Sequence, residues 1–209
     1  MSDFRIGFTG CAGTGKTTLA RALAKELDIP FLSAKDITQP VLDDGGYDYS
    51  SGIAIERFLA DPERQLELLR RTTEVQSEHK VFVTDRTVVD LAAYATKELH
   101  RIDEKTLRRI HDECRQFSER YTDIVMCPWR DVPVGDNKRR TLNPWYQFII
   151  HSIDRSLLQE WGLCRGKTMT LLADGYEARM KALLFQFDII NGQRDAGLDP
   201  NNLPNKSEA

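Results

Sequence analysis

The chain has 209 residues, of which 41% are hydrophobic and 29% are charged, and its formal net charge is −3. This size and composition are typical of one globular domain, and the small net charge argues against a protein that coats nucleic acid or a membrane surface. No apolar run approaches the roughly 20 residues that a membrane helix needs. The N-terminus runs directly into an apolar stretch from Phe4, so we expect no signal peptide.

Strand-like and helix-like segments alternate along the chain. The predicted strands cover residues 4–9, 29–32, 81–84, 123–127 and 167–172. The predicted helices cover residues 16–27, 34–43, 87–99, 103–120, 144–161 and 175–190, and a further long helical stretch after the loop 43–52 is interrupted at Asp61 and Pro62. Five strands that are each followed by a helix predict an α/β fold, a single domain over residues 1–190 with a mainly parallel sheet and helices on both faces. Residues 191–209 are predicted to be a flexible tail.

The four cysteines, at positions 11, 114, 127 and 164, form no C-x-x-C pair. A zinc site is therefore not indicated, and the four histidines are scattered as well. We expect reduced thiols and a cytoplasmic protein.

A glycine-rich motif joins the first predicted strand to the first predicted helix. It reads Gly10-Cys11-Ala12-Gly13-Thr14-Gly15-Lys16-Thr17, which matches G-x-x-x-x-G-K-[ST], the phosphate-binding P-loop. Glycines allow backbone N–H groups to approach an anion closely, and the helix N-terminus adds partial positive charge. In this motif Lys16 reaches the β- and γ-phosphates of ATP, and the Thr17 hydroxyl is a ligand of Mg²⁺. The predicted ATP-binding residues are Gly10, Cys11, Ala12, Gly13, Thr14, Gly15, Lys16, Thr17 and Thr18, in a three-layer P-loop NTPase fold.

A second motif follows the third predicted strand, where Asp85 and Arg86 come directly after Thr84. Ligands of parallel sheets bind at the carboxyl ends of the strands. We therefore predict that Asp85 serves Mg²⁺ or the acceptor and that Arg86 holds a phosphate group. The alternative is that Asp85 caps the next helix and that Arg86 is a surface charge.

The segment Val83–Thr87, with Asp90 and Tyr94 after it, resembles the D-R-[S/T/Y]-x-x-[D/S]-x-x-x-Y segment of the P-loop nucleoside and nucleotide kinases. That group includes thymidylate kinases, phage-type deoxynucleoside monophosphate kinases and the NadR-like ATP-binding proteins. The resemblance runs over about residues 4–190 and implies catalytic roles for Lys16, Asp85 and Arg86. It also implies that Asp90 and Tyr94 lie on the acceptor side, although Tyr94 fits a core position equally well. Thymidylate-kinase-like proteins are often dimers, so a homodimer is left open.

A basic loop follows the fourth predicted strand and includes Arg130, Arg139 and Arg140. Such a loop can bring positive charge to the transferring phosphate and exclude water when it closes. The loop resembles the LID of nucleotide kinases, and Asp136–Arg139 is similar to a D-G-x-R element with Asn137 in place of glycine. The resemblance implies a catalytic role for Arg139 and ATP contacts for Arg130 and Arg140. The alternative is a solvated charged loop.

The acceptor site of nucleotide kinases lies between the second and third strands, where this chain offers Asp36, Tyr47 and Arg57. An aromatic ring there could stack on a base, and Arg57 could hold a monophosphate. The resemblance implies a small-molecule acceptor, and a deoxynucleoside monophosphate is the first candidate. A nucleoside such as nicotinamide riboside or a deoxynucleoside is second, and a modified base in DNA is third.

Other classes of P-loop protein fit the sequence less well. A GTPase would show N-K-x-D, whereas the internal match, Asn137–Arg140, lacks the aspartate. An AAA-type ATPase would carry an Asp-Glu pair and a helical lid domain, whereas Asp85 is followed by Arg86. A regulatory P-loop ATPase that acts through a protein partner remains the alternative of another class.

Overall fold

The fold is a parallel sheet between two layers of helices. The structure is a computed structural model that describes residues 4–48, 52–129 and 144–195. The strands are β1 (Arg5–Thr9), β2 (Phe31–Leu32), β3 (Phe82–Thr84), β4 (Asp123–Met126) and β5 (Thr168–Thr170). They pair in the order β2-β3-β1-β4-β5, and all four pairings are parallel. This arrangement confirms the predicted α/β class and places β1, which precedes the P-loop, in the middle of the sheet.

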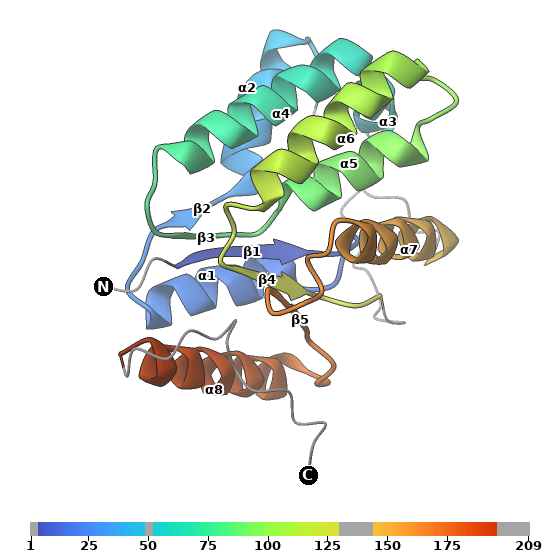
Figure 1. Ribbon diagram of the computed structural model, residues 1–209. Coiled ribbons are helices and arrows are strands. Elements are labelled where there is room, and N and C mark those ends of the chain that lie inside the picture. The colour runs from blue at the N-terminus through green and yellow to red at the C-terminus, as the bar shows by residue number, and fades with distance from the viewer. Residues whose placement is uncertain (1–3, 49–51, 130–143, 196–209) are drawn as a thin grey trace.

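The helices cover both faces of this sheet. They are α1 (Lys16–Glu26), α2 (Ala34–Asp44), α3 (Gly52–Leu59), α4 (Pro62–Ser77), α5 (Val88–Lys97), α6 (Glu104–Ser118), α7 (Pro144–Glu160) and α8 (Tyr176–Asp195). Helices α1 and α8 lie on one face, and α2, α4, α5 and α6 lie on the other, with α7 beside α5 (Figure 1). The three predicted layers are therefore present.

Two hydrophobic cores fill the space between the layers, one on each face of the sheet. Because successive side chains of a strand point to opposite faces, Ile124 and Met126 of β4 join the core under α5, while Val125 joins the core under α1 and α8. Leu23 of α1 and Leu183 of α8 are fully buried in that second core. Burial of each such side chain stabilises the fold by roughly 1.5–3 kcal/mol.

The predicted helix boundaries agree with the structure to within two residues except at the C-terminus. The Asp61 carboxylate accepts hydrogen bonds from the backbone N–H groups of Glu63 (3.0 Å) and Arg64 (3.3 Å), so it begins α4 at the predicted break. Helix α8 continues to Asp195, five residues past the predicted end at 190 and into the segment predicted as a tail. Residues 196–209 of that tail, and the predicted LID with Arg130, Arg139 and Arg140, lie outside the described residues.

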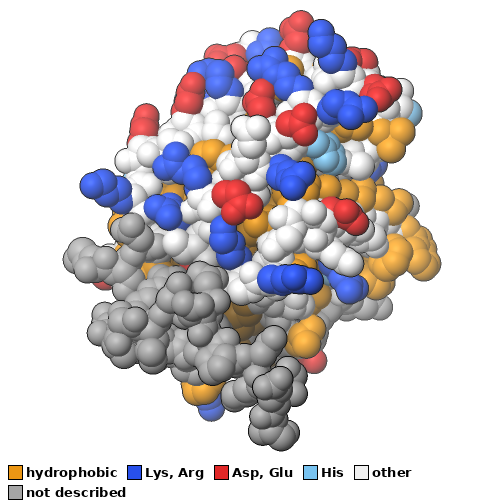
Figure 2. Space-filling model, in the orientation of Figure 1, with side chains coloured by type: hydrophobic (Ala, Val, Ile, Leu, Met, Phe, Trp, Pro, Cys, Tyr) orange, Lys and Arg blue, Asp and Glu red, His pale blue; other side chains and the backbone are white. Residues whose placement is uncertain are grey.

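The surface over α4 and α6 carries Lys or Arg next to Asp or Glu side chains (Figure 2). Ion pairs such as Arg70–Glu67 (2.6 Å) and Arg109–Glu113 (2.7 Å) connect neighbouring turns of these helices. Exposed pairs of this kind contribute only about 0.3–0.5 kcal/mol each to the stability of the fold. In the part of the chain that the structure describes, no helix is both long and apolar enough to span a membrane.

Candidate active site

The P-loop turns tightly between the end of β1 and the start of α1. Gly10, Gly13 and Gly15 have φ angles of 131°, 87° and 86°, in the left-handed region that favours glycine. A Cβ atom at position 10 would also meet the carbonyl oxygen of Cys127, which follows β4. The strand, loop and helix thus have the arrangement that the motif predicts, with the N-terminus of α1 directed into the loop.

Two hydrogen-bonded side chains hold the loop from inside and outside. The Lys16 ammonium donates to the carbonyl oxygens of Gly10 and Cys11. On the outside, Arg179 of α8 is buried and donates from Nη1 to the carbonyl oxygen of Thr14 (2.8 Å) and from Nε to that of Ala173 (2.9 Å). Sequence reasoning missed Arg179, because one arginine in a helical pattern reads as a surface charge.

Thr17 and Asp85 meet at the edge of the sheet where β1 and β3 end. The Thr17 hydroxyl donates to Asp85 Oδ2 (2.6 Å), and the backbone N–H of Ala34 donates to Asp85 Oδ1 (2.7 Å). Asp85 is only 7% exposed, and the residue that caps α5 is Thr87, so the capping alternative for Asp85 is wrong. A hydroxyl and a carboxylate are the oxygen ligands that Mg²⁺ prefers beside a triphosphate, so Thr17 and Asp85 fit the predicted metal site.

Asp90 lies beneath the P-loop rather than in an open acceptor pocket. Its Oδ1 accepts from the backbone N–H of Gly10 (3.1 Å), and its Oδ2 accepts from the backbone N–H and the hydroxyl of Thr87 (both 2.9 Å). It is 1% exposed. We therefore assign Asp90 to support of the P-loop, in place of the acceptor contact that the resemblance implied.

The buried side chain of Tyr121 fixes the start of α5 from the other side. The Tyr121 hydroxyl accepts from the backbone N–H of Val88 (3.1 Å) and donates to Gln76 Oε1 of α4 (2.8 Å). Burial raises the pKa of Tyr121, so the hydroxyl stays protonated and keeps both interactions. The turn that holds Asp85 and Arg86 is thereby positioned relative to α4 and α5.

Arg86 stands close to two tyrosines from different helices. Its guanidinium lies 5.7 Å from the ring centroid of Tyr94, which is half-buried on α5. Burial raises the pKa of Tyr146, on α7, to about 12, and Arg86 is near enough to oppose that effect. The Lys97 ammonium lies 4.5 Å from the ring centroid of Tyr146. Sequence reasoning named Tyr94 and missed Tyr146, which stands among several aromatic residues of an amphipathic helix.

Asp154 is the second residue of α7 that sequence reasoning missed. Its side chain is completely buried, and neither carboxyl oxygen has a hydrogen-bond partner among the residues that the structure describes. Burial and the nearby Asp90 carboxylate raise the pKa of Asp154 well above its usual value, while Lys16 and Arg86 act in the opposite direction. A single aspartate at helical spacing gives no sequence signal for such a position.

The three predicted acceptor residues lie between β2 and β3, on α2, on the loop after α2 and on α3. The Tyr47 hydroxyl donates to Asp61 Oδ2 (2.9 Å), and its ring meets Phe58 edge-on at 5.6 Å, so it packs the loop onto α3 and α4. Asp36 and Arg57 are exposed on α2 and α3. The contacts that Tyr47 makes with Asp61 and Phe58 thus lie beside α3 and α4.

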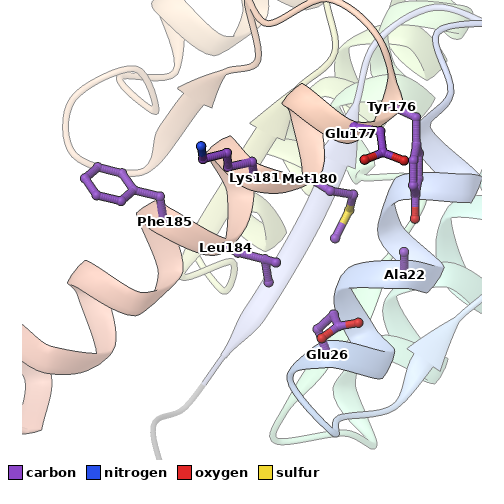
Figure 3. Close-up of a pocket in the computed structure, with 8 residues that line it drawn as sticks. All are labelled: Ala22, Glu26, Tyr176, Glu177, Met180, Lys181, Leu184 and Phe185. Atoms are coloured by element: carbon purple, nitrogen blue, oxygen red, sulfur yellow. The ribbon is translucent and has the colours of Figure 1, made fainter.

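A groove between α1 and α8 lies apart from this constellation (Figure 3). It is lined by apolar side chains such as Met180 and Leu184 and by the charged side chains of Glu26 and Lys181. None of the residues at the P-loop, at Asp85-Arg86 or on α7 lines it. The groove therefore has no part in the site described above.

The cysteines are free thiols, and Cys11 lies buried within the P-loop. Burial raises the pKa of Cys11 to about 11, with Lys16 opposing the effect. The Cys11 thiol is therefore protonated at neutral pH and is not a reactive thiolate.

Comparisons with known proteins agree with this fold. A family model described as "AAA domain" matches residues 5–173. A NadR protein in complex with NR has a TM-score of 0.65 at 18% identity, over 95% of this chain and 53% of that one. A deoxyadenosine kinase from M. mycoides has a TM-score of 0.64 at 12% identity, over 88% of this chain and 98% of its own. A thymidylate kinase from Ehrlichia chaffeensis has a TM-score of 0.52 at 14% identity, over 90% of this chain and 98% of its own.

These likenesses show a shared fold, that of the P-loop nucleoside and nucleotide kinases. The chain spans about half the length of the NadR chains that it matches. No curated protein matches the sequence significantly. The individual roles of the residues therefore rest on the geometry of this chain.

Proposed function

Because this chain belongs to the AAA domain family and has the fold of the P-loop nucleoside and nucleotide kinases, we propose that it is an ATP- and Mg²⁺-dependent phosphotransferase. The chain lacks the Asp-Glu pair of AAA-type ATPases at this position, because Arg86 follows Asp85. Because one fold can support many functions, the residues of the site decide between them.

The hydrogen bond between Thr17 and Asp85 carries the proposal. It joins the hydroxyl at the N-terminus of α1 to the carboxylate at the end of β3 (2.6 Å). Both groups would hold Mg²⁺, which in this reaction neutralises the charge that develops on the phosphates. Lys16 would reach the β- and γ-phosphates, and Arg86 would stand on the acceptor side. The protein's contribution is then positioning and charge stabilisation, without a covalent intermediate.

The acceptor is proposed to be a nucleotide or a nucleoside. A deoxynucleoside monophosphate is the first candidate, because the Asp85-Arg86 segment resembles that of the nucleotide kinases. This acceptor remains a prediction. A nucleoside is the second candidate, and one structural observation favours it. The carboxyl of Asp154, near Lys16 and Arg86, has no hydrogen-bond partner within residues 4–48, 52–129 and 144–195.

ADP formation from Mg-ATP, measured against a panel of nucleosides and deoxynucleoside monophosphates, tests this function. We expect one or two acceptors to stimulate ADP formation strongly. Lys16→Ala should abolish the stimulation, while Lys25→Ala, an exposed lysine of the same helix, should leave it unchanged. ADP formation that no acceptor stimulates would contradict a small-molecule kinase and favour DNA or a regulatory protein partner.

A further inference from the structure

The unpartnered carboxyl of Asp154 is the feature of α7 that the proposed function does not yet use. Asp154 is 0% exposed, and neither Oδ1 nor Oδ2 accepts a hydrogen bond from any residue in the described part of the chain. Removing a carboxyl group from water without such partners costs considerable free energy. A group kept under these conditions is a candidate for contact with a ligand that supplies hydrogen-bond donors.

Asp154 is located where phosphoryl transfer would take place. Among the described residues, the cations that act on it are Lys16 and Arg86, the residues proposed for the γ-phosphate and the acceptor. The titratable or charged groups that face it are Asp90 and Tyr94 from α5, Lys16 and Cys11 from the P-loop, and Arg86 after β3. Helix α7 thus brings one carboxyl group to the junction of the donor and acceptor sides.

The other two carboxylates at this junction already have partners on both oxygens. Asp85 accepts from Thr17 and Ala34. Asp90 accepts from Gly10 and Thr87. Of these three carboxyl groups, only that of Asp154 has no partner on either oxygen among the described residues, so both oxygens can interact with the reacting group of an acceptor.

Tyr146 extends this arrangement along α7. It lies eight residues before Asp154, which corresponds to about 12 Å along a helix at a rise of 1.5 Å per residue. Arg86 acts on both Tyr146 and Asp154, and Tyr94 has both of them as neighbours. Helix α7 therefore places the aromatic ring of Tyr146 and the carboxyl group of Asp154 along the acceptor side. The distance between the two positions is comparable with the length of a nucleoside.

We propose that Asp154 hydrogen-bonds the hydroxyl group that attacks the γ-phosphoryl group, and that the acceptor is therefore an uncharged nucleoside and not its monophosphate. This inference rests on the proposed phosphotransferase function. As the bond from the acceptor oxygen to the γ-phosphorus forms, the hydroxyl proton passes to the Asp154 carboxylate. The bond between the γ-phosphorus and the β,γ-bridging oxygen breaks, and ADP leaves with that electron pair.

A monophosphate acceptor fits this position less well. Its phosphate carries about −1.5 to −2 charge at neutral pH and would face the Asp154 carboxylate directly. It also has no proton that must be removed before attack, so a base would add nothing. A nucleoside hydroxyl both donates to the carboxylate and needs a proton acceptor.

Rates with one nucleoside and with its own 5′-monophosphate, measured across pH, test the assignment. We expect the wild-type protein to prefer the nucleoside by more than about 100-fold in kcat/KM, and its kcat to fall at acid pH as Asp154 becomes protonated. Asp154→Asn should lower kcat for the nucleoside by about 10²–10⁴-fold with little change in KM, and should remove that acid limb. Asp154→Glu should restore part of kcat, and Ser156→Ala, exposed on the same helix, should match the wild type.

The possible outcomes separate this inference from the proposed function. A wild-type protein that prefers the monophosphate, or an Asp154→Asn variant with an unchanged acid limb, overturns the role of Asp154 and leaves the kinase intact. A protein that phosphorylates neither compound nor any other acceptor refutes the proposed function itself. Should Asp154→Asn fail to fold, the wild-type preference and pH profile still decide.

Discussion

The backbone N–H of Gly10 donates a 3.1 Å hydrogen bond to Oδ1 of Asp90, although 80 residues separate the two in sequence. This contact fastens the first glycine of the P-loop to the first turn of α5. Because Oδ2 of the same carboxylate accepts from Thr87, one buried side chain connects the phosphate-binding loop with the turn that carries Asp85 and Arg86.

Asp90→Ala should therefore weaken both the fold and ATP binding. The change leaves buried donors of Gly10 and Thr87 without an acceptor, which costs about 1–3 kcal/mol of unfolding free energy. We expect Mg-ATP affinity to fall at least tenfold, measured by calorimetry alongside denaturant unfolding. Asp103→Ala is the matched control, since Asp103 is an exposed cap of α6 that accepts from Thr106 (3.0 Å). It should cost about 1 kcal/mol and leave ATP affinity unchanged.

Thr17→Val should strongly reduce Mg²⁺-dependent turnover while keeping the shape of the side chain. The variant removes the hydroxyl that donates to Asp85 Oδ2 and that would hold Mg²⁺. A loss on the order of 10²–10³-fold in kcat is expected for a group that stabilises transition-state charge. Thr17→Ser retains the hydroxyl and should stay within about tenfold of the wild type, so equal losses in both variants would speak against a metal-holding role.

Tyr47→Phe should lower stability without changing acceptor KM. It removes the hydrogen bond from the Tyr47 hydroxyl to Asp61 and retains the edge-on contact with Phe58. The expected cost is about 0.5–1.5 kcal/mol, measured by denaturant unfolding. A raised acceptor KM with unchanged stability would instead support the acceptor role predicted from the sequence.

Acid should destabilise the fold partly through His111. Burial holds the pKa of His111 below its ordinary value of 6.5, and its Nε2 lies 2.7 Å from the Thr96 hydroxyl. The unfolded chain therefore binds a proton at His111 more readily than the folded chain does. The stability that neutral His111 contributes is complete above pH 6.5, and it is lost as the pH falls through the lower pKa that His111 has in the folded protein.

Unfolding free energies measured from neutral to acid pH check this. His111→Gln should lose less stability over that range than the wild type. His151, whose pKa is also lowered by burial and by Arg155, should account for part of the remaining loss. His100→Gln, exposed after α5, serves as the control, and an equal acid response in all variants would contradict the assignment.

Local patterns in the sequence were sufficient for the fold and for the phosphate-binding loop. The P-loop needs glycines at particular backbone angles, and Gly10, Gly13 and Gly15 supply them within one short segment. Asp61 likewise marks the start of α4 by a contact within three residues. Such features depend on neighbours in sequence, so the sequence alone reveals them.

The residues that sequence reasoning misplaced or missed depend on contacts between distant segments. Asp90 meets Gly10 only because β1 pairs with β3, and Arg179 reaches Thr14 across 165 residues. Asp154 enters the site because α7 packs on α5. Tyr47 stands in a polar loop, where it resembled a base-stacking residue, but its partners Phe58 and Asp61 come from the following helices. No local pattern encodes these placements.

The most direct measurement of the central claim follows a labelled γ-phosphoryl group of ATP in the presence of Mg²⁺ and the acceptor panel. If this chain is a phosphotransferase, the label will appear in a phosphorylated nucleoside or nucleotide, and Lys16→Ala will prevent its transfer. Label that appears only in inorganic phosphate, at a rate that no acceptor changes, would contradict the account and identify the protein as an ATPase.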